Sequence, residues 1–299
     1  EVRFYEKYLF FKLLEMIRSL IKKMYWTGIW KYPPFKQMYY LHDRWFKKKY
    51  KWNRQYLITI GWVDLKIIAD VTNSFLAKEV AIKWYYEKGT SSYFCDNIKK
   101  WSVFLDIGAN IGYYSLIASK KVWWEWRVIA FEPVKKNYES LLENIEINSI
   151  KNVSAFNFWL WNKEETSKIH LIDSDSGKSS IMVDYQWEVE QVQIKRFDDL
   201  DLDFDKSKVQ FIKIDVEGYE FEVLRWMRNL LQENKALEIM LEFSPEYYQE
   251  FGKDYTLQFI GFIYALWFSA FDVDNGFVPI TLTEENTYPQ KNILLKRNS

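Results

Sequence analysis

The sequence predicts an α/β fold with a mostly parallel sheet, helices on both faces of that sheet and an antiparallel last strand. Two observations carry this prediction. From residue 102 onward, short β-rich runs alternate with helical segments, which is the pattern of strands joined by helical crossovers. The first of these runs leads into a glycine turn at 106–112, whose last glycine opens a helix. With 299 residues, the chain can bury the core of one large domain and carry an extension.

The N-terminal extension differs in charge from the rest of the chain. Residues 1–54 carry 14 Lys and Arg against 4 Asp and Glu, which leaves 27 against 37 for residues 55–299. Apolar residues at near-helical spacing over 4–25 predict an amphipathic helix. We therefore expect a basic, aromatic, helical preface at 1–54 and a main domain at 55–299 with its core at 98–245. The preface either packs its aromatic residues on the main domain or contacts a membrane surface or polyanion.

The elements of the main domain follow from periodicity and from turn residues. Residues 56–70 alternate as a short hairpin around Gly61, and 78–87 has helical spacing that Gly89 ends. The strands expected in the core are 103–106, 128–131, 153–158, 211–214 and 237–243, and the helices between them are 112–121, 135–148 and 219–231.

The remaining segments are expected to complete the sheet or to add to it. The stretch 169–196 predicts extra antiparallel strands around a turn at 173–177. Ser244 and Pro245 open a last helix, because proline is favoured at the first helical position. The segments around 262–271, 277–282 and 292–296 then complete the sheet.

Acidic and polar residues close the predicted strands. In an open α/β sheet the ligand lies beyond the carboxyl ends of the strands, so these residues form one set. They are Asp106, Glu132, Asn157, Asp215 and Glu217. A site lined by this set is expected to attract a cationic or zwitterionic ligand.

The glycine turn narrows the choice of ligand. It allows the backbone to approach a ligand at Gly108 and opens a helix at Gly112, but it lacks the third glycine of a pyrophosphate-binding dinucleotide turn. S-Adenosylmethionine carries an ammonium and a sulfonium, which suit an acidic site. Glu132 can accept hydrogen bonds from ribose hydroxyls. Each feature also has a structural alternative, since Asp106 can cap a helix and Glu132 with Pro133 can start one.

Several motifs together resemble the FkbM-type methyltransferase family. They are Ile98-Lys-Lys to Gly112, Val128-Ile-Ala-Phe-Glu-Pro133, Phe197-Asp-Asp-Leu200, Ile212-Lys-Ile-Asp-Val-Glu-Gly-Tyr-Glu220 and Leu241-Glu-Phe243. The resemblance implies a class I, Rossmann-like methyltransferase with a seven-stranded sheet that methylates a hydroxyl of a sugar, glycolipid or related small molecule. It also implies a set of cofactor-binding residues: Asp106, Gly108, Ala109, Asn110, Gly112, Glu132 and Asp215. Asp215 and Glu217 are implied to lie near the transferred methyl group.

Proton removal from an alcohol needs a base, and the two histidines, His42 and His170, lie outside the strand-end set. The catalytic candidates are therefore Asp215, Glu217 and Glu242, as base or as groups that position the acceptor. Their spacing matches no metal-ligand motif, so we expect no metal. Two other functions remain open: an NAD(P)-dependent oxidoreductase on a similar sheet, and a catalytically silent S-adenosylmethionine-binding protein.

Composition bears on location and partners. The single cysteine, Cys95, excludes an intrachain disulfide and fits a reducing compartment, and no apolar run is long enough for a membrane span. We expect a cytoplasmic protein, with peripheral membrane contact through residues 1–54, acting on a small-molecule or glycan acceptor and not on nucleic acid.

Tryptophan occurs at several positions, such as short loops, where the expected backbone conformation favours glycine. The chain has 15 Trp and 10 Gly, and three indoles crowd the short loop 120–127, a place for glycine and polar residues. Our hypothesis is that nine of these codons are UGA, read as glycine in the source. The nine positions are Trp62, Trp101, Trp123, Trp124, Trp126, Trp159, Trp161, Trp226 and Trp267. The competing readings are a genuine aromatic surface and engineered substitutions.

Overall fold

The computed structural model describes the main domain and leaves the predicted preface outside the described residues. It describes residues 55–60, 63–69, 74, 76–77, 79–80, 85–123, 125–161, 164–171, 179–180, 189–202, 204–288 and 290–297. The helix expected at 4–25 and the turn expected at 173–177 both lie outside these ranges. The division into a preface and a main domain stays a prediction.

The expected hairpin is present and lies against a core helix. β1 (Gln55–Ile60) pairs with β2 (Val63–Ile68) in antiparallel register. The backbone N–H groups of Lys66 and Ile68 donate to the side-chain oxygens of Asn148 (3.0 Å) and Asn144 (2.6 Å), at the end of α6 (Lys135–Ile147). Side-chain amides therefore replace a third strand as partners of this hairpin.

The segment after the hairpin agrees with its prediction only in part, since the described residues 79–80 are helical. Residues 85–87 form a bend, and Gly89 lies inside α4 (Lys88–Asn97) where it was expected to end a helix. The reason is the backbone of Glu87, which takes a left-handed conformation with φ of 41° and starts α4 two residues before the glycine. A non-glycine residue is seldom held in this conformation without a local cause.

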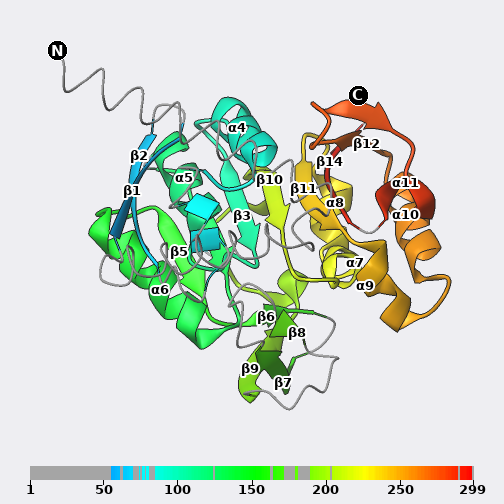
Figure 1. The fold of residues 1–299 in the computed structure, drawn as a ribbon, viewed down its shortest axis with the longest axis horizontal. Coiled ribbons are helices and arrows are strands. Elements are labelled where there is room, and N and C mark those ends of the chain that lie inside the picture. Colours follow the sequence, from blue (N-terminus) through cyan, green and yellow to red (C-terminus); the bar gives the residue numbers. More distant parts are fainter. Residues whose placement is uncertain are drawn as a thin grey trace, which may run out of the picture. The chain divides into compact units, whose positions relative to one another are not determined.

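The central sheet has eight strands, in the order β13-β12-β14-β11-β10-β3-β4-β5 (Figure 1). Five neighbouring strands are parallel: β3 (Val103–Ile107), β4 (Val128–Phe131), β5 (Val153–Phe156), β10 (Val209–Ile214) and β11 (Glu238–Phe243). β14 (Lys291–Arg297) runs antiparallel between β11 and β12 (Phe268–Asp272), and β13 (Val278–Ile280) adds an antiparallel edge. The mostly parallel sheet with an antiparallel last strand is thus confirmed.

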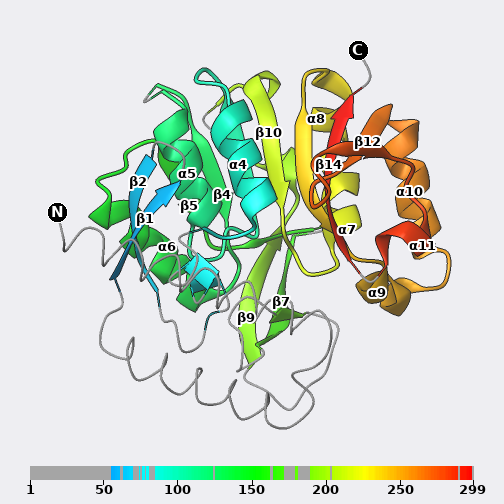
Figure 2. The ribbon, with the colours of Figure 1, turned by 45° about the horizontal axis from the view of Figure 1, so that its top comes forward.

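The chain turns in opposite directions from the middle of this sheet. From β3 it proceeds through α5 (Tyr113–Lys121) and α6 to β4 and β5; from β10 it proceeds through α7 (Glu220–Arg225) and α8 (Arg228–Glu233) to β11. Right-handed crossovers in opposite directions place these helices on opposite faces. Figure 2 shows α4 and α5 beside β4, and α7 and α8 beside β14. β3 and β10 are adjacent, so the gap between their carboxyl ends is the topological switch point.

Two predicted elements in the C-terminal half were wrong in part. The expected helix 219–231 is divided into α7 and α8, because Trp226 and Met227 leave helical geometry, with ψ of 8° and 19°. The apolar run 262–271 was expected as strand, but α10 (Tyr255–Ala265) occupies its beginning. An uninterrupted apolar run fits a buried strand and a buried helix equally well.

The smaller elements fill in around the sheet. The second sheet has the order β6-β9-β7-β8, and its β7 and β9 form the antiparallel pair expected within 169–196. α9 begins at Pro245, as predicted. The members not yet named are β6 (Trp159–Leu160), β7 (Glu165–Leu171), β8 (Ser179–Ser180), β9 (Val189–Lys195), α9 (Pro245–Tyr248), α11 (Glu284–Thr287) and the 3-10 turns Phe197–Asp199, Lys206–Lys208 and Gln249–Phe251.

The described tryptophans of the glycine hypothesis have different environments. Trp267 has a φ of 63° and is 74% exposed, and Trp101 and Trp123 are also exposed. The indole N–H groups of Trp159, Trp161 and Trp226 are buried without an acceptor. Buried donors are normally paired, but Trp159 and Trp161 pack edge-on against Tyr219 and Arg196 lies over Trp226. The left-handed backbone of Trp267 is therefore the feature that favours glycine. Trp62 and Trp124 lie outside the described residues.

Candidate functional site

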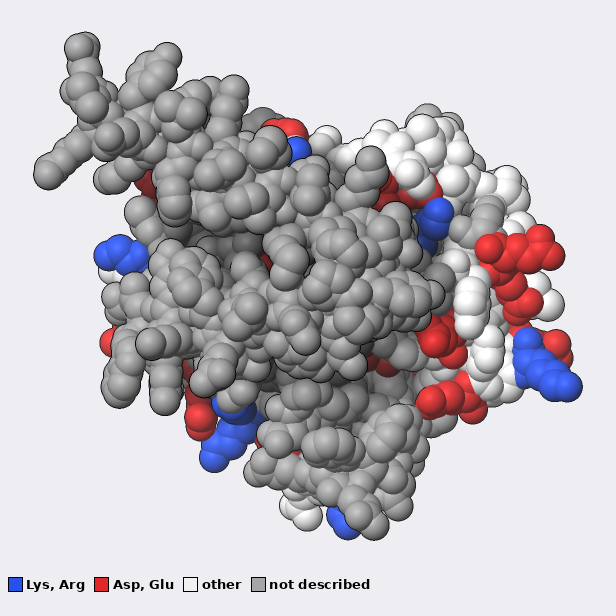
Figure 3. All heavy atoms as spheres, in the orientation of Figure 1, with Lys and Arg blue, Asp and Glu red and all other residues white. Residues whose placement is uncertain are grey.

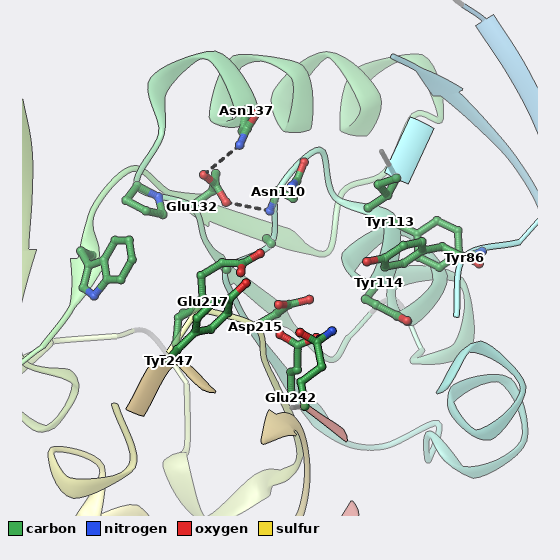
Figure 4. Close-up of a pocket in the computed structure, with 17 residues that line it drawn as sticks. Tyr86, Asn110, Tyr113, Tyr114, Glu132, Asn137, Asp215, Glu217, Glu242 and Tyr247 are labelled. Atoms are coloured by element: carbon green, nitrogen blue, oxygen red, sulfur yellow. Dashed lines mark hydrogen bonds between the residues drawn. The ribbon is translucent and has the colours of Figure 1, made fainter. Parts of the chain in front are cut away.

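A cavity of about 320 Å³ opens at the switch point (Figure 4). Its walls come from the turns after β3, β4 and β10, from the end of β11 and from the bend before α4. The lining residues are Leu76, Tyr86, Gly108, Ala109, Asn110, Tyr113, Tyr114, Glu132, Pro133, Asn137, Trp159, Asp215, Val216, Glu217, Glu242, Tyr247 and Gln290. Seven of the nine predicted site residues are therefore brought together here; Asp106 and Gly112 are not in the wall.

The glycine turn after β3 is held by close packing. Gly108 has a φ of 82°, and a Cβ atom there would lie 1.9 Å from the carbonyl oxygen of Asp215, so the turns after β3 and β10 pass in contact. Gly112, with a φ of 91°, would place a Cβ atom 2.4 Å from Cδ1 of Leu141 on α6. Both positions require glycine. Gly112 contributes by seating the start of α5 on α6.

Glu132 joins the turns after β3 and β4. Its Oε2 atom accepts from the backbone N–H of Asn110 (2.7 Å), and its Oε1 atom accepts from the backbone N–H of Val134 (3.0 Å) and from the side chain of Asn137 (3.4 Å). Burial raises the pKa of Glu132 to about 7, against the opposing effect of these donors. Among the described residues, Oε2 accepts from one donor only, so it retains a lone pair for a hydroxyl group of a ligand.

Asp106 lies beneath the turn. It is 1% exposed, and its Oδ2 atom accepts from the hydroxyl of Ser115 on α5 at 2.5 Å. Burial raises its pKa to about 6. The carboxylate thus fixes the glycine turn to α5, and the direct cofactor contact that the resemblance implies stays a prediction.

The turn after β10 places two carboxylates in the cavity wall. Asp215 is paired through Oδ2 with the Nζ atom of Lys213, 3.0 Å away, whose side chain is 1% exposed. Glu217 has a φ of 49°, a left-handed conformation that bulky residues seldom adopt. Glu220 holds this turn in place, because its Oε1 atom accepts from the backbone N–H groups of Val216 (3.3 Å) and Gly218 (3.2 Å).

Glu242 faces the same cavity from β11. Burial, and then the neighbouring charges of Asp215 and Glu220, raise its pKa to about 8. Its Oε1 atom accepts from the side-chain amide of Gln290 at 2.9 Å. Figure 4 shows Glu242 next to Asp215, with Glu217 and Tyr247 on the other side of Asp215. A carboxyl group with a pKa near neutrality is suited to accept a proton.

Sequence reasoning missed the aromatic wall and the buried lysine. Tyr86, Tyr113 and Tyr114 line one side, and Tyr247 lines another (Figure 4). They come from three segments that are far apart in the sequence, at 86, 113–114 and 247, so no regular spacing identifies them as one set. Lys213 could have been found, because a lysine inside an otherwise apolar strand is rarely buried without a partner.

The chemistry of the lining is acidic and aromatic. Four carboxylates face the cavity, from Glu132, Asp215, Glu217 and Glu242, and no lysine, arginine or histidine is among the described lining residues. Carboxylates and the faces of tyrosine rings attract cations, and carboxylates and amides bind hydroxyl groups. A pyrophosphate would be repelled.

The chain is similar to several known proteins. A protein named "Methyltransferase 1" from Beauveria bassiana (strain ARSEF 2860) is 27% identical over 173 residues, which cover 50% of this chain and 66% of that protein. The chain therefore spans just under two thirds of that relative's length. Two solved structures with lower similarity are Trm5b from Pyrococcus abyssi (14% identity, TM-score 0.42, covering 81% of this chain and 55% of that one) and precorrin-6y C5,15-methyltransferase from Geobacter metallireducens GS-15 (12% identity, TM-score 0.41, covering 71% and 88%).

The family assignment rests on a match to more than half of the chain. Residues 106–276 match the model of the methyltransferase FkbM domain. The match begins at the end of β3 and includes the turns that carry Glu132, Asp215 and Glu217 and the strand that carries Glu242. The sheet, with β14 reversed between β11 and β12, is of the class I methyltransferase type that the resemblance implied. It has β13 as an eighth strand at its edge, where the resemblance implied seven. This chain belongs to the FkbM methyltransferase domain family.

Proposed function

We propose that this chain is an S-adenosylmethionine-dependent O-methyltransferase that acts on a hydroxyl of a sugar, a glycolipid or a related small molecule. The observation that carries the proposal is the acidic cavity at the switch point of a class I sheet, with Glu242 in its wall. The cavity combines groups suited to a cationic nucleoside with a group suited to accept a proton.

The residues present fit S-adenosylmethionine by the chemistry of the donor set. Glu132 offers a lone pair for a ribose hydroxyl, and the backbone of Gly108, Ala109 and Asn110 borders the cavity as a turn that a ligand can approach closely. Asp215 and Glu217 supply negative charge on the other side. When bound, S-adenosylmethionine supplies an electrophilic methyl group on a sulfonium centre.

The protein contributes positioning and proton removal. Methyl transfer gains mostly from holding the acceptor oxygen and the methyl group close together and in line. Asp215 and Glu217 are placed to accept hydrogen bonds from the acceptor, because they lie in the wall between the glycine turn and Tyr247. Glu242 takes the proton from the acceptor hydroxyl, since its raised pKa matches that task near neutral pH.

The same lining argues against nucleotide and nucleic-acid ligands. The oxidoreductase alternative needs a pyrophosphate at the glycine turn, beside four carboxylates. Nucleic acid is also disfavoured as acceptor: on the face in Figure 3, acidic side chains gather on the right, in the part that the structure describes. We keep a small-molecule or glycan acceptor and a cytoplasmic location as part of the proposal. No helix in the described part of the chain is long and apolar enough to cross a bilayer.

The proposal is tested with the purified chain and methyl-deuterated S-adenosylmethionine. Free sugars, glycolipids and small alcohols are offered as acceptors, and mass spectrometry follows S-adenosylhomocysteine and the labelled product. We expect both to form with a hydroxyl-bearing acceptor in wild type and to be lost in Glu242→Gln. Glu143→Gln, an exposed carboxylate on α6, is the matched control. Binding of NAD without binding of S-adenosylmethionine would support the oxidoreductase alternative, and cofactor binding without product from any acceptor would support the silent one.

A further inference from the structure

Lys213 is a buried cation behind the cavity wall. It lies in β10 between β3 and β11, its side chain is 1% exposed, and it does not line the cavity. Its Nζ atom lies 3.0 Å from Oδ2 of Asp215 and 5.4 Å from the ring centre of Tyr114. A charge at this depth is stable only when it is paired.

A second buried carboxylate, that of Glu87, interacts with Lys213. Glu87 accepts from the hydroxyl of Tyr114 (2.6 Å) and from the side chain of Asn292 (3.4 Å), and its left-handed backbone places it at the start of α4. Burial raises its pKa, while Lys213 acts in the opposite direction. Burial also lowers the pKa of Lys213, but Asp215 and Glu87 more than offset this effect, so the ammonium stays charged.

We propose that Lys213 is a positioning residue of the methyl-transfer site: its ammonium holds the Asp215 carboxylate in the cavity wall and places a positive charge among the carboxylates around Glu242. The proposal rests on the proposed function, in which Glu242 is the base. Lys213 reaches the reaction through Asp215 and Glu242 and is not in the cavity wall. Without it, the carboxylates of Asp215 and Glu242 would share the cavity wall with no buried cation from the described residues beside them.

The groups that face Glu242 come from every element packed against β11. The charged groups are Lys213 and Asp215 from β10, Glu220 from α7 and Glu87 from the start of α4. The uncharged groups are the amide of Gln290 before β14 and the phenols of Tyr86, Tyr247 and Tyr248. Of the charged groups, Lys213 favours ionisation of Glu242, and the three carboxylates oppose it.

Binding of S-adenosylmethionine and S-adenosylhomocysteine measures this effect without an acceptor. Only the first ligand has the sulfonium charge, so its advantage in affinity grows as Glu242 ionises. Calorimetry over pH 6 to 10 measures the ratio of the two affinities at each pH. In wild type this ratio should rise with pH about a midpoint, and Glu242→Gln should abolish the rise. We expect Lys213→Met to raise this midpoint by about 1–3 pH units and Glu87→Gln to lower it, because a nearby unit charge has an effect of about this size. The two variants thus shift the midpoint in opposite directions.

The matched control is Lys296→Met. Lys296 pairs with Glu238 at 3.1 Å, at the far end of β11, four residues or about 13 Å along the strand from Glu242. This variant should lower the melting temperature and leave the midpoint unchanged. If Lys213→Met does not fold, Lys213→Gln is measured instead; it should raise the midpoint in the same way, because it also removes the charge. An unchanged midpoint in a folded Lys213→Met or Lys213→Gln would overturn the role of Lys213, whereas failure of wild type to bind S-adenosylmethionine would overturn the proposed function itself.

Discussion

The backbone N–H of Asn110 donates to Oε2 of Glu132 at 2.7 Å, and this bond joins the turn after β3 to the turn after β4. Asn110 reaches this position through a left-handed backbone, with a φ of 51°. Asparagine tolerates that conformation better than most residues. The bond fixes the mouth of the cavity from two strands at once.

Glu132→Ala should therefore weaken S-adenosylmethionine binding by about 10- to 100-fold, the effect of losing a charged hydrogen-bond acceptor. Calorimetric titration measures it, and Glu143→Ala on the exposed face of α6 serves as the control. Glu132→Gln should retain part of the affinity, since its amide oxygen can still accept from Asn110. A Glu132→Ala variant that binds as tightly as wild type would contradict this role.

Asp106→Ala should also weaken binding, but by loosening the glycine turn. The hydroxyl of Ser115 donates to Asp106 at 2.5 Å, so Ser115→Ala should have a smaller effect of the same kind. Both variants should lower the melting temperature together with the affinity. Unchanged affinity in both Asp106→Ala and Glu132→Ala would refute the assignment of this cavity to the cofactor.

The ligand-free protein should lose stability as the pH rises. Burial raises the pKa values of Asp106 to about 6 and of Glu132 and Glu220 to about 7, above the values near 4 of an unfolded chain. The folded state therefore binds more protons between pH 4 and 7, and stability falls as these protons are lost. Thermal unfolding should show a lower melting temperature at pH 8 than at pH 5, with a smaller difference in Glu220→Gln. A melting temperature that rises over this range would contradict the raised values.

Methyl transfer should depend on an ionised Glu242. With its pKa near 8, the rate constant kcat/KM should rise with pH up to about that value, because the base must first be deprotonated. Glu242→Gln should lower kcat by about 10²- to 10⁴-fold, while affinity for S-adenosylmethionine at pH 7 stays near wild type. Glu217→Ala should slow transfer with binding retained. If Glu242→Gln keeps wild-type kcat, the base lies elsewhere.

The protein should be more stable with glycine at position 267. A bulky side chain in left-handed geometry costs about 1–2 kcal/mol, and Trp267 gains little packing at 74% exposure. Trp267→Gly should raise the melting temperature by about 2–4 °C for each kcal/mol recovered. Trp267→Ala isolates the backbone effect, because it removes the indole and keeps Cβ. Sequencing the gene tests the wider hypothesis: UGG at all nine positions would end it.

The sequence was most informative where one segment determines its own structure. The strands at 103–106 and 128–131 and the glycine turn between β3 and α5 were found within about one residue, since apolar runs and glycine mark them locally. The break at Trp226 and the helix α10 were missed, because tertiary packing decided between equally good local patterns. In the site, the strand-end carboxylates could be predicted from topology. Tyr86 and Gln290 could not, because only the complete fold brings them into the cavity wall.

The order of the sheet has a further consequence, for synthesis. β14 lies between β11 and β12, so each of these two earlier strands lacks its partner on that side until residues 291–297 have been made. Gln290, whose side chain donates to Glu242, is synthesised directly before β14. On the ribosome, the cofactor turns can form well before the wall of the cavity that Gln290 completes. The nascent chain thus carries an exposed sheet edge at β11 for about 50 residues of elongation, the interval in which chaperones would have to protect it.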